Sequence, residues 1–128
     1  MNERQNPMDV QMFETALDAS ASTVTATSAA YNIGKRIGAQ TLFFEPVENS
    51  GTATDVTVTA DIRGSNNSGW CIDNAVGTIT AAQIAAGTSV FFALSGLSWW
   101  TWANEIRFKV AGASGTYNIT LNGSLEGF

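Results

Sequence analysis

The sequence has no histidine and only one cysteine, Cys71. These absences exclude a catalytic triad with a histidine base, a disulfide framework, and a zinc site of cysteine and histidine ligands. Because neither a base nor a second thiol accompanies Cys71, we expect a buried, inert thiol rather than a nucleophile. The chain carries no catalytic motif, so the sequence predicts a protein that is not an enzyme and binds no cofactor and no metal.

Charge is scarce as well, and most of it is negative. Charged residues make up 13% of the chain, and six Lys and Arg against eleven Asp and Glu give a formal net charge of -5. Nucleic-acid binding needs a basic patch, and six scattered cations do not form one. No run approaches the ~20 apolar residues of a membrane helix, and the first residues lack the apolar segment of a secretory signal. We therefore expect neither nucleic acid nor membrane as a partner, and synthesis in a reducing cytoplasm.

What the chain does have is an alternation of apolar and polar residues with a period of two. Residues 56–62, 106–110 and 117–121 each follow this pattern, which is typical of half-buried strands. Clusters of Gly, Ser and Asn separate the segments and predict turns. The inward positions of the strands predict a core that includes the following residues: Ile62, Phe108, Val110, Ile119 and Leu121.

One short helix interrupts the strand pattern. Thr80 and Gln83 have the spacing of a capping box, and Gly87 stands where a helix ends in a left-handed residue. The sequence therefore predicts an all-β fold, an antiparallel β-sandwich of jelly-roll or immunoglobulin-like type. We expect seven to nine strands and one short helix near residues 81–86.

Two blocks, residues 41–44 and 90–94, are apolar without alternation. This pattern favours central strands, or strands whose outer face meets another surface. For the domain organisation we expect an extended N-terminal arm over residues 1–11 and a single β-sandwich domain over residues 12–128. Because the arm is too polar to dock on its own sandwich, we expect it to add a strand to a neighbouring subunit, with interface residues Met8, Val10 and Met12.

Trp99, Trp100 and Trp102 form an aromatic run near the middle of the sequence's second half. Three interpretations compete for it: core filling, a protein interface, and a platform for sugars. If the segment is a strand, alternation places Trp99 and Trp100 on opposite faces. If the segment is a loop at one end of the sandwich, the large rings still need cover from water. In either case we expect one of these two rings in the core and the other at an interface.

The order of features along residues 12–126 resembles a known family. The features are the apolar block Leu42-Phe43-Phe44, a strand ending in a Ser/Asn/Gly loop before Trp70, the short capped helix, and two final alternating strands. They are similar to the small β-sandwich head decoration (cement) proteins and virion structural proteins of tailed bacteriophages. The resemblance implies a structural virion protein that binds the outer surface of the head and stabilises the capsid lattice. It implies the major capsid protein and sister subunits of a homo-oligomer as partners, and a location on the capsid exterior after synthesis in the host cytoplasm.

A second function is compatible with the same residues. A carbohydrate-binding or adhesin-like β-sandwich module could use exposed Trp99 and Trp100 as a platform for sugars. A glycan array separates the two hypotheses, because a sugar-binding module should bind some glycan and a cement protein should bind none.

Overall fold

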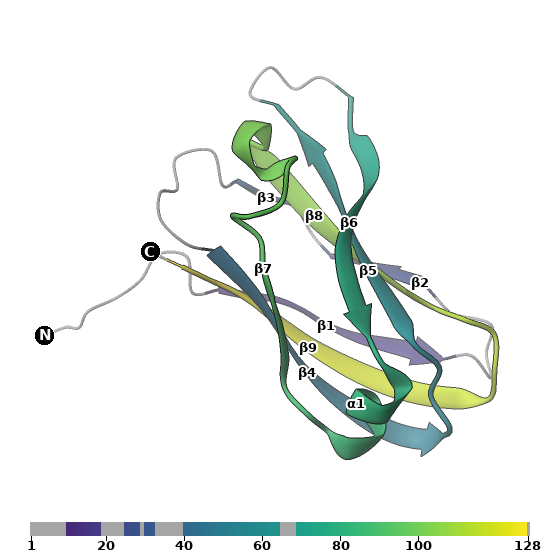
Figure 1. Ribbon diagram of the computed structural model, residues 1–128. Coiled ribbons are helices and arrows are strands. Elements are labelled where there is room, and N and C mark those ends of the chain that lie inside the picture. Colours follow the sequence, from purple (N-terminus) through teal and green to yellow (C-terminus); the bar gives the residue numbers. More distant parts are fainter. Residues whose placement is uncertain (1–9, 19–24, 29, 33–39, 65–68, 128) are drawn as a thin grey trace, which may run out of the picture.

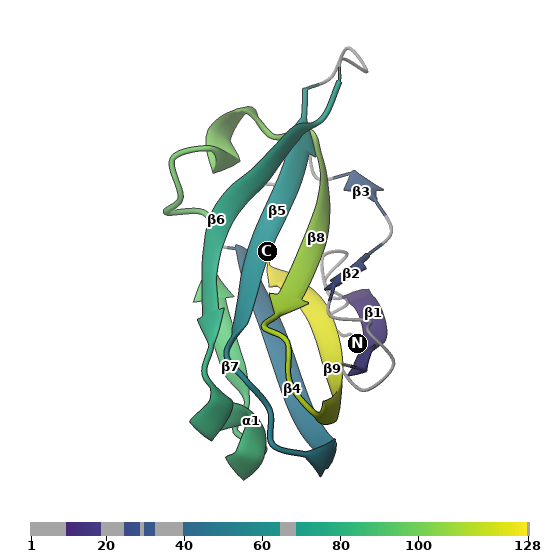
Figure 2. The same cartoon turned by 90° about the vertical axis from the view of Figure 1, so that its right-hand side faces the viewer.

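The computed structural model describes residues 10–18, 25–28, 30–32, 40–64 and 69–127, which form two antiparallel sheets packed face to face (Figure 1). The first sheet has the spatial order β1-β9-β4-β7, with these bounds: β1 Val10–Asp18, β9 Tyr117–Gly127, β4 Gln40–Gly51 and β7 Val90–Ala93. The second has the order β2-β8-β5-β6, with β3 also paired to β8: β2 Thr25–Thr27, β3 Tyr31–Asn32, β8 Glu105–Gly112, β5 Val56–Arg63 and β6 Cys71–Ile79. Figure 2 shows the strands of each sheet next to one another, with β6, β5 and β8 in one sheet and β7, β4, β9 and β1 in the other. The predicted antiparallel β-sandwich is confirmed.

The strand order identifies the sandwich as a jelly roll rather than an immunoglobulin-like fold. Strands pair from the two ends of the chain inwards: β1 with β9, β2 and β3 with β8, β4 with β7, and β5 with β6. The chain is thus one long antiparallel hairpin rolled up so that successive pairs fall in alternate sheets. This arrangement is the double-sheet jelly roll, an architecture that viral capsid proteins and lectin domains share.

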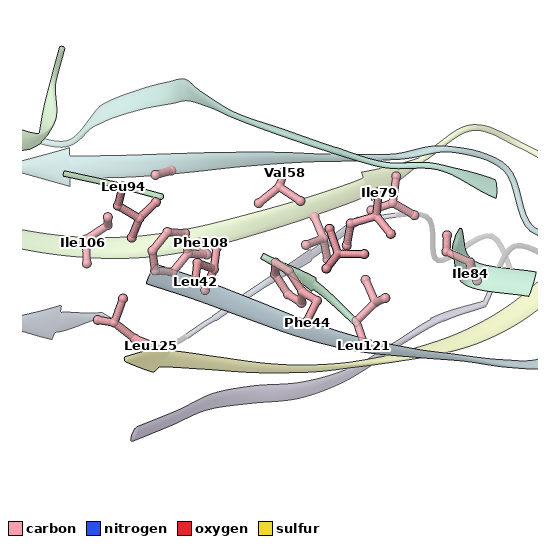
Figure 3. Packing of buried hydrophobic residues seen from close by; sticks show 14 of the residues in the cluster. Leu42, Phe44, Val58, Ile79, Ile84, Leu94, Ile106, Phe108, Leu121 and Leu125 are labelled. Atoms are coloured by element: carbon pink, nitrogen blue, oxygen red, sulfur yellow. The ribbon is translucent and has the colours of Figure 1, made fainter. Parts of the chain in front are cut away.

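The core lies between the sheets and follows the predicted alternation (Figure 3). All five predicted core residues have no exposed surface: Ile62, Phe108, Val110, Ile119 and Leu121. Leu42 and Phe44 of β4 are equally buried and, with the β9 residues, form the first sheet's side of the core. Their outward neighbours on β4, Phe43 and Glu45, stand on the opposite face of the strand.

The predicted helix is α1 (Ala81–Ala86), which connects β6 to β7 at one end of the sandwich. The Thr80 hydroxyl accepts from the Gln83 backbone N–H at 3.2 Å, and the Gln83 side chain accepts from the Thr80 N–H at 2.9 Å. Gly87 closes the helix at φ 68°, a left-handed conformation that costs glycine little. Ile84 holds this short element against the core because its side chain is fully buried. No helix within the described residues is long and apolar enough to cross a membrane.

The sandwich begins at Val10, two residues before the predicted domain boundary. Val10 pairs with Leu125 and Gln11 with Ser124, so this part of the predicted arm is a strand of its own sandwich. Strand addition to a neighbouring subunit stays a prediction. The register shifts between Gln11 and Phe13, which leaves Met12 at a bulge. The reason is that β9 would otherwise present an open edge, and β1 satisfies its backbone hydrogen bonds. Residues 1–9, with Met8, lie outside the described residues.

Candidate functional site

The aromatic run does not form a strand, so the alternation expected there does not apply. Trp99 lies in a turn and precedes the 3₁₀ helix Trp100–Trp102. The Trp99 ring is 9% exposed, and its Nε1 donates to the Ala75 carbonyl at 3.1 Å. Trp100 packs at the margin of the core, with its ring centroid 6.1 Å from that of Trp99. Trp99 therefore fills the core and cannot act as a sugar platform, while the interface role of Trp100 stays a prediction.

A charged cluster covers the outer face of the second sheet around Asp61. This side chain is 1% exposed although it points away from the core, because β6 and β8 supply its cover. Its Oδ1 accepts from the Asp73 backbone N–H at 3.0 Å, and its Oδ2 accepts from Arg107 Nε at 2.8 Å. Lys109 Nζ lies 3.8 Å from Asp61 and 2.8 Å from Asp73. We call these residues, with Arg63, Glu105 and Trp70, the Asp61 cluster.

Electrostatic interactions within the Asp61 cluster favour the charged forms of Asp61 and Lys109. Burial alone would raise the pKa of Asp61, but hydrogen bonds from the Asp73 N–H and Arg107, with the nearby positive charge of Lys109, outweigh it and lower that pKa. The hydrogen bond to the Asp73 carboxylate raises the pKa of Lys109. Both groups thus stay charged at neutral pH and stabilise each other.

Trp70 completes the Asp61 cluster at the end of the sheet. The guanidinium carbons of Arg63 and Arg107 each lie 4.3 Å from the Trp70 ring centroid, within cation–π distance. Arg63 also pairs with Glu105, its cross-strand neighbour. Each cation of the cluster thus has a carboxylate partner within it. The cluster is balanced in charge, which makes it a poor site for an ionic ligand.

Cys71 corrects one expectation. Its side chain is exposed and not buried. The cause is the irregular register between β5 and β6, which shifts twice and breaks the alternation along β6. Asn74 Nδ2 donates to the Cys71 carbonyl at 2.9 Å and to the Ala60 carbonyl at 3.1 Å, which fixes this bulged segment. Within the described residues there is no group of three His, Cys, Asp or Glu side chains that could hold a metal ion.

The outer face of the first sheet carries an aromatic pair that is open to solvent. Phe43 of β4 and Phe91 of β7 are cross-strand partners, and their ring centroids lie 5.7 Å apart at an interplanar angle of 40°. Phe91 is 64% exposed, the largest exposure among the large apolar side chains described. Large apolar rings left in water commonly mark a surface that another molecule covers. We call Phe43 and Phe91 the phenylalanine platform; the sequence signal for it was the apolar block at residues 90–94.

Polar side chains continue this face away from the platform. Glu45 lies two residues along β4 from Phe43 and pairs across the strand with Asn122 of β9. Further along, Asn49 Nδ2 donates at 2.8 Å to both Asn118 Oδ1 and Thr120 Oγ1, which orders the outward row of β9. Since neighbouring strands lie ~4.8 Å apart, Glu45 and Asn122 are within about 10 Å of the platform. The face therefore combines an apolar surface with hydrogen-bond donors and acceptors.

The positions predicted for an interface are thus not brought together. Trp99 is in the core, where its Nε1 donates to the Ala75 carbonyl of β6, and Trp100 is at the margin of the core. Val10 and Met12 belong to β1, at the edge of the first sheet away from β7, and Met8 lies outside the described residues. Sequence reasoning missed Phe91 as a site residue. In a continuous apolar block, every residue has the same hydrophobic pattern, and only the position of the strand in the sheet decides which of them faces outward.

Comparison with known proteins supports the fold. No protein-family model and no curated protein matches the chain in sequence. A carbohydrate-binding module specific for non-crystalline cellulose, CBM28, is similar in structure with a TM-score of 0.57 at 9% identity, over 91% of this chain and 74% of that chain. This likeness shows a shared β-sandwich fold.

Two further solved structures are less similar. An adhesin domain of Lys-gingipain from Porphyromonas gingivalis has a TM-score of 0.48 at 16% identity, covering 81% of this chain and 63% of that one. A carbohydrate-binding module of endoglucanase Cel5A from Eubacterium cellulosolvens has a TM-score of 0.46 at 9% identity, covering 94% and 98%. Both TM-scores lie below that of CBM28.

Proposed function

We propose that this chain is a non-catalytic carbohydrate-binding module that binds a neutral glycan on the outer face of its first sheet. The observation that carries the proposal is the phenylalanine platform, with its exposed Phe91 ring, next to the polar pair Glu45 and Asn122. A sugar ring has one face of C–H groups and a rim of hydroxyls. The first packs on an aromatic ring, and the second needs hydrogen-bond donors and acceptors beside it.

The charges on this face favour a neutral ligand. All Lys and Arg side chains within the described residues belong to the Asp61 cluster on the other sheet. The described charge nearest the platform is the carboxylate of Glu45, which would repel an acidic sugar. The platform replaces the tryptophan surface predicted for this function, since Trp99 is buried.

A glycan array of neutral and acidic polysaccharides, followed by calorimetric titration of the strongest ligand, tests the proposal. We expect binding to a neutral glycan, and a loss of at least ~10-fold in affinity for Phe91→Ala, because an aromatic anchor contributes on the order of 2 kcal/mol. Val47→Ala is the matched control, since Val47 is also exposed (47%) on β4 but stands away from the rings. An array without any binding, or equal losses in the two variants, would contradict the proposal.

The second candidate function is the capsid-surface role implied by the resemblance to phage decoration proteins. The observation in its favour is the jelly-roll topology, which viral capsid proteins use as well as lectins. The fold alone does not decide between the two, because one fold hosts many functions. Binding to purified phage heads together with a blank glycan array would favour the capsid role.

A further inference from the structure

The strand β7 lies at an open edge of the sandwich. It ends the order β1-β9-β4-β7, and among the described strands only β4 pairs with it. An edge strand presents a row of backbone N–H and C=O groups that can pair with another strand. Proteins normally protect such edges by keeping the strand short or by placing bulges, charged side chains or proline in it. Of these, β7 has only its short length of four residues.

The edge strands β1 and β6 carry irregularities of register, and β7, a strand of four residues, does not. The register of β1 with β9 shifts once, and that of β6 with β5 shifts twice, with Asp73 of β6 at φ 61°. The pairing of β7 with β4 runs without a shift from Val90 to Ala93. Its sequence, Val-Phe-Phe-Ala, contains no charge and no proline. A regular, apolar edge of this kind is a template for strand addition.

The surroundings of β7 favour a second copy of the chain as the partner. With a net charge of -5, two copies repel each other over most of their surface. The residues of β7 and the β4 residues paired with them, Thr41 to Phe44, are uncharged. The paired segments themselves therefore add no charge repulsion when two copies approach along their β7 strands.

We propose that β7 pairs antiparallel with β7 of a second copy, so that two four-stranded sheets become one eight-stranded sheet. A two-fold axis perpendicular to the sheet keeps outward residues opposite outward residues. Placing the axis at Phe91 sets the two Phe91 rings directly opposite each other and sets Phe92 opposite Val90. The two phenylalanine platforms then join into one row of four rings.

The inward side of β7 is compatible with this pairing. Phe92 is packed over Gly77 of β6 so closely that a Cβ on Gly77 would lie 2.4 Å from the ring. The ring thus closes the gap between the two sheets and is already fixed, while Phe91 on the outward side is free to meet its counterpart. The pairing uses the exposed edge without disturbing the core. It does not rest on glycan binding, although a joined platform would suit an extended sugar chain.

Charged substitutions at the axis test both the partner and the register. We expect the wild-type chain to dimerise in sedimentation experiments between about 10 µM and about 1 mM, because a short strand pair forms a small interface. Phe91→Lys and Phe91→Glu each place two like charges opposite each other and should weaken the dimer roughly 30-fold. An equal mixture of the two variants should restore a heterodimer, because the opposite charges then face each other.

The controls separate this inference from the glycan proposal. Val47→Lys adds a charge to the same face away from the axis and should leave the dimer intact. Asn122→Ala should weaken glycan binding without changing dimerisation, which is measured in the absence of sugar. Thermal melting verifies that each variant folds. A wild-type chain that stays monomeric at every concentration, or a mixture that fails to restore the heterodimer, would overturn the inference.

Discussion

Replacing Asp61 by asparagine removes one negative charge from the Asp61 cluster while keeping the shape of the side chain. The oxygen of the new amide can still accept from the Asp73 N–H, now at 3.0 Å. What is lost is the ion pair with Arg107, at 2.8 Å, and the attraction of Lys109, at 3.8 Å. The amide nitrogen of Asp61→Asn would take the place of Oδ2 and face the guanidinium of Arg107, from which it can accept no hydrogen bond.

The expected cost follows from the burial of the two partners. Removing one partner of a fully buried ion pair typically lowers the free energy of unfolding by about 3–5 kcal/mol, whereas an exposed pair contributes ~1 kcal/mol or less to it. Asp61 is buried, but the Arg107 side chain is 32% exposed and can turn to water. We therefore expect Asp61→Asn to lower the free energy of unfolding by about 2 kcal/mol at pH 7. For a chain of this length, that corresponds to roughly 6 to 10 °C in melting temperature.

Urea denaturation as a function of pH measures the effect and its origin. The folded state lowers the pKa of Asp61 below its ordinary value of 3.8. Stability from this carboxylate is therefore fully present above pH 3.8 and is lost as the pH falls through the lower, folded-state pKa. The difference between wild type and Asp61→Asn should be constant from pH 7 to about pH 5 and shrink below pH 3.8.

Asp73→Asn provides the matched control for this prediction. Asp73 also pairs with Lys109, at 2.8 Å, but its side chain is 58% exposed, so its loss should change stability by less than ~0.5 kcal/mol. Asparagine also tolerates the positive φ of 61° at this position. Equal stability of Asp61→Asn and wild type at pH 7, or a difference that does not change in acid, would refute the reasoning.

Two further predictions concern packing and capping. Trp99→Ala should cost ~3–5 kcal/mol because it empties a buried site, whereas Trp100→Ala, at the margin of the core, should cost about 1 kcal/mol. Urea denaturation of both variants measures this, and equal costs would show that the two rings are buried alike. Thr80→Ala should cost ~1 kcal/mol because it removes the helix cap, while Thr88→Ala beyond the helix should stay within ~0.5 kcal/mol. A calorimetric melt in which both threonine variants match wild type would contradict the role of the cap.

The regular parts of the fold were predictable because their signals are local. In a sheet with one solvated face, the alternation around Ile62, Phe108 and Ile119 is enough to place these side chains in the core. The helix was predictable because Thr80, Gln83 and Gly87 each satisfy a backbone requirement within one or two turns. These features depend on nearest neighbours along the chain and not on which strands meet.

The candidate sites were less predictable, and the reasons are specific. For Trp99 and Trp100 the sequence left a strand and a loop open, and only the structure shows a turn at Trp99 followed by a 3₁₀ helix, with the Trp99 side chain in the core. In the sequence, Asp61 has the position of an outward, solvent-facing residue of an alternating strand. It is buried because residues of β6 and β8 pack over it, and the sequence pattern does not show this packing. Cys71 is exposed because the β5–β6 register shifts, which a single strand does not reveal.

The sequence by itself determined the fold class, the core positions and the capped helix, because period-two patterning and capping act over a few residues. Tertiary structure alone decided the jelly-roll order and, with it, which strands became edges. The apolar block at residues 90–94 was compatible with a central strand or with a covered outer face. Among the described strands β7 pairs only with β4, so it lies at an edge, and the Phe91 ring is left in solvent. Such exposure depends on contacts between segments far apart in sequence, and no local pattern encodes them.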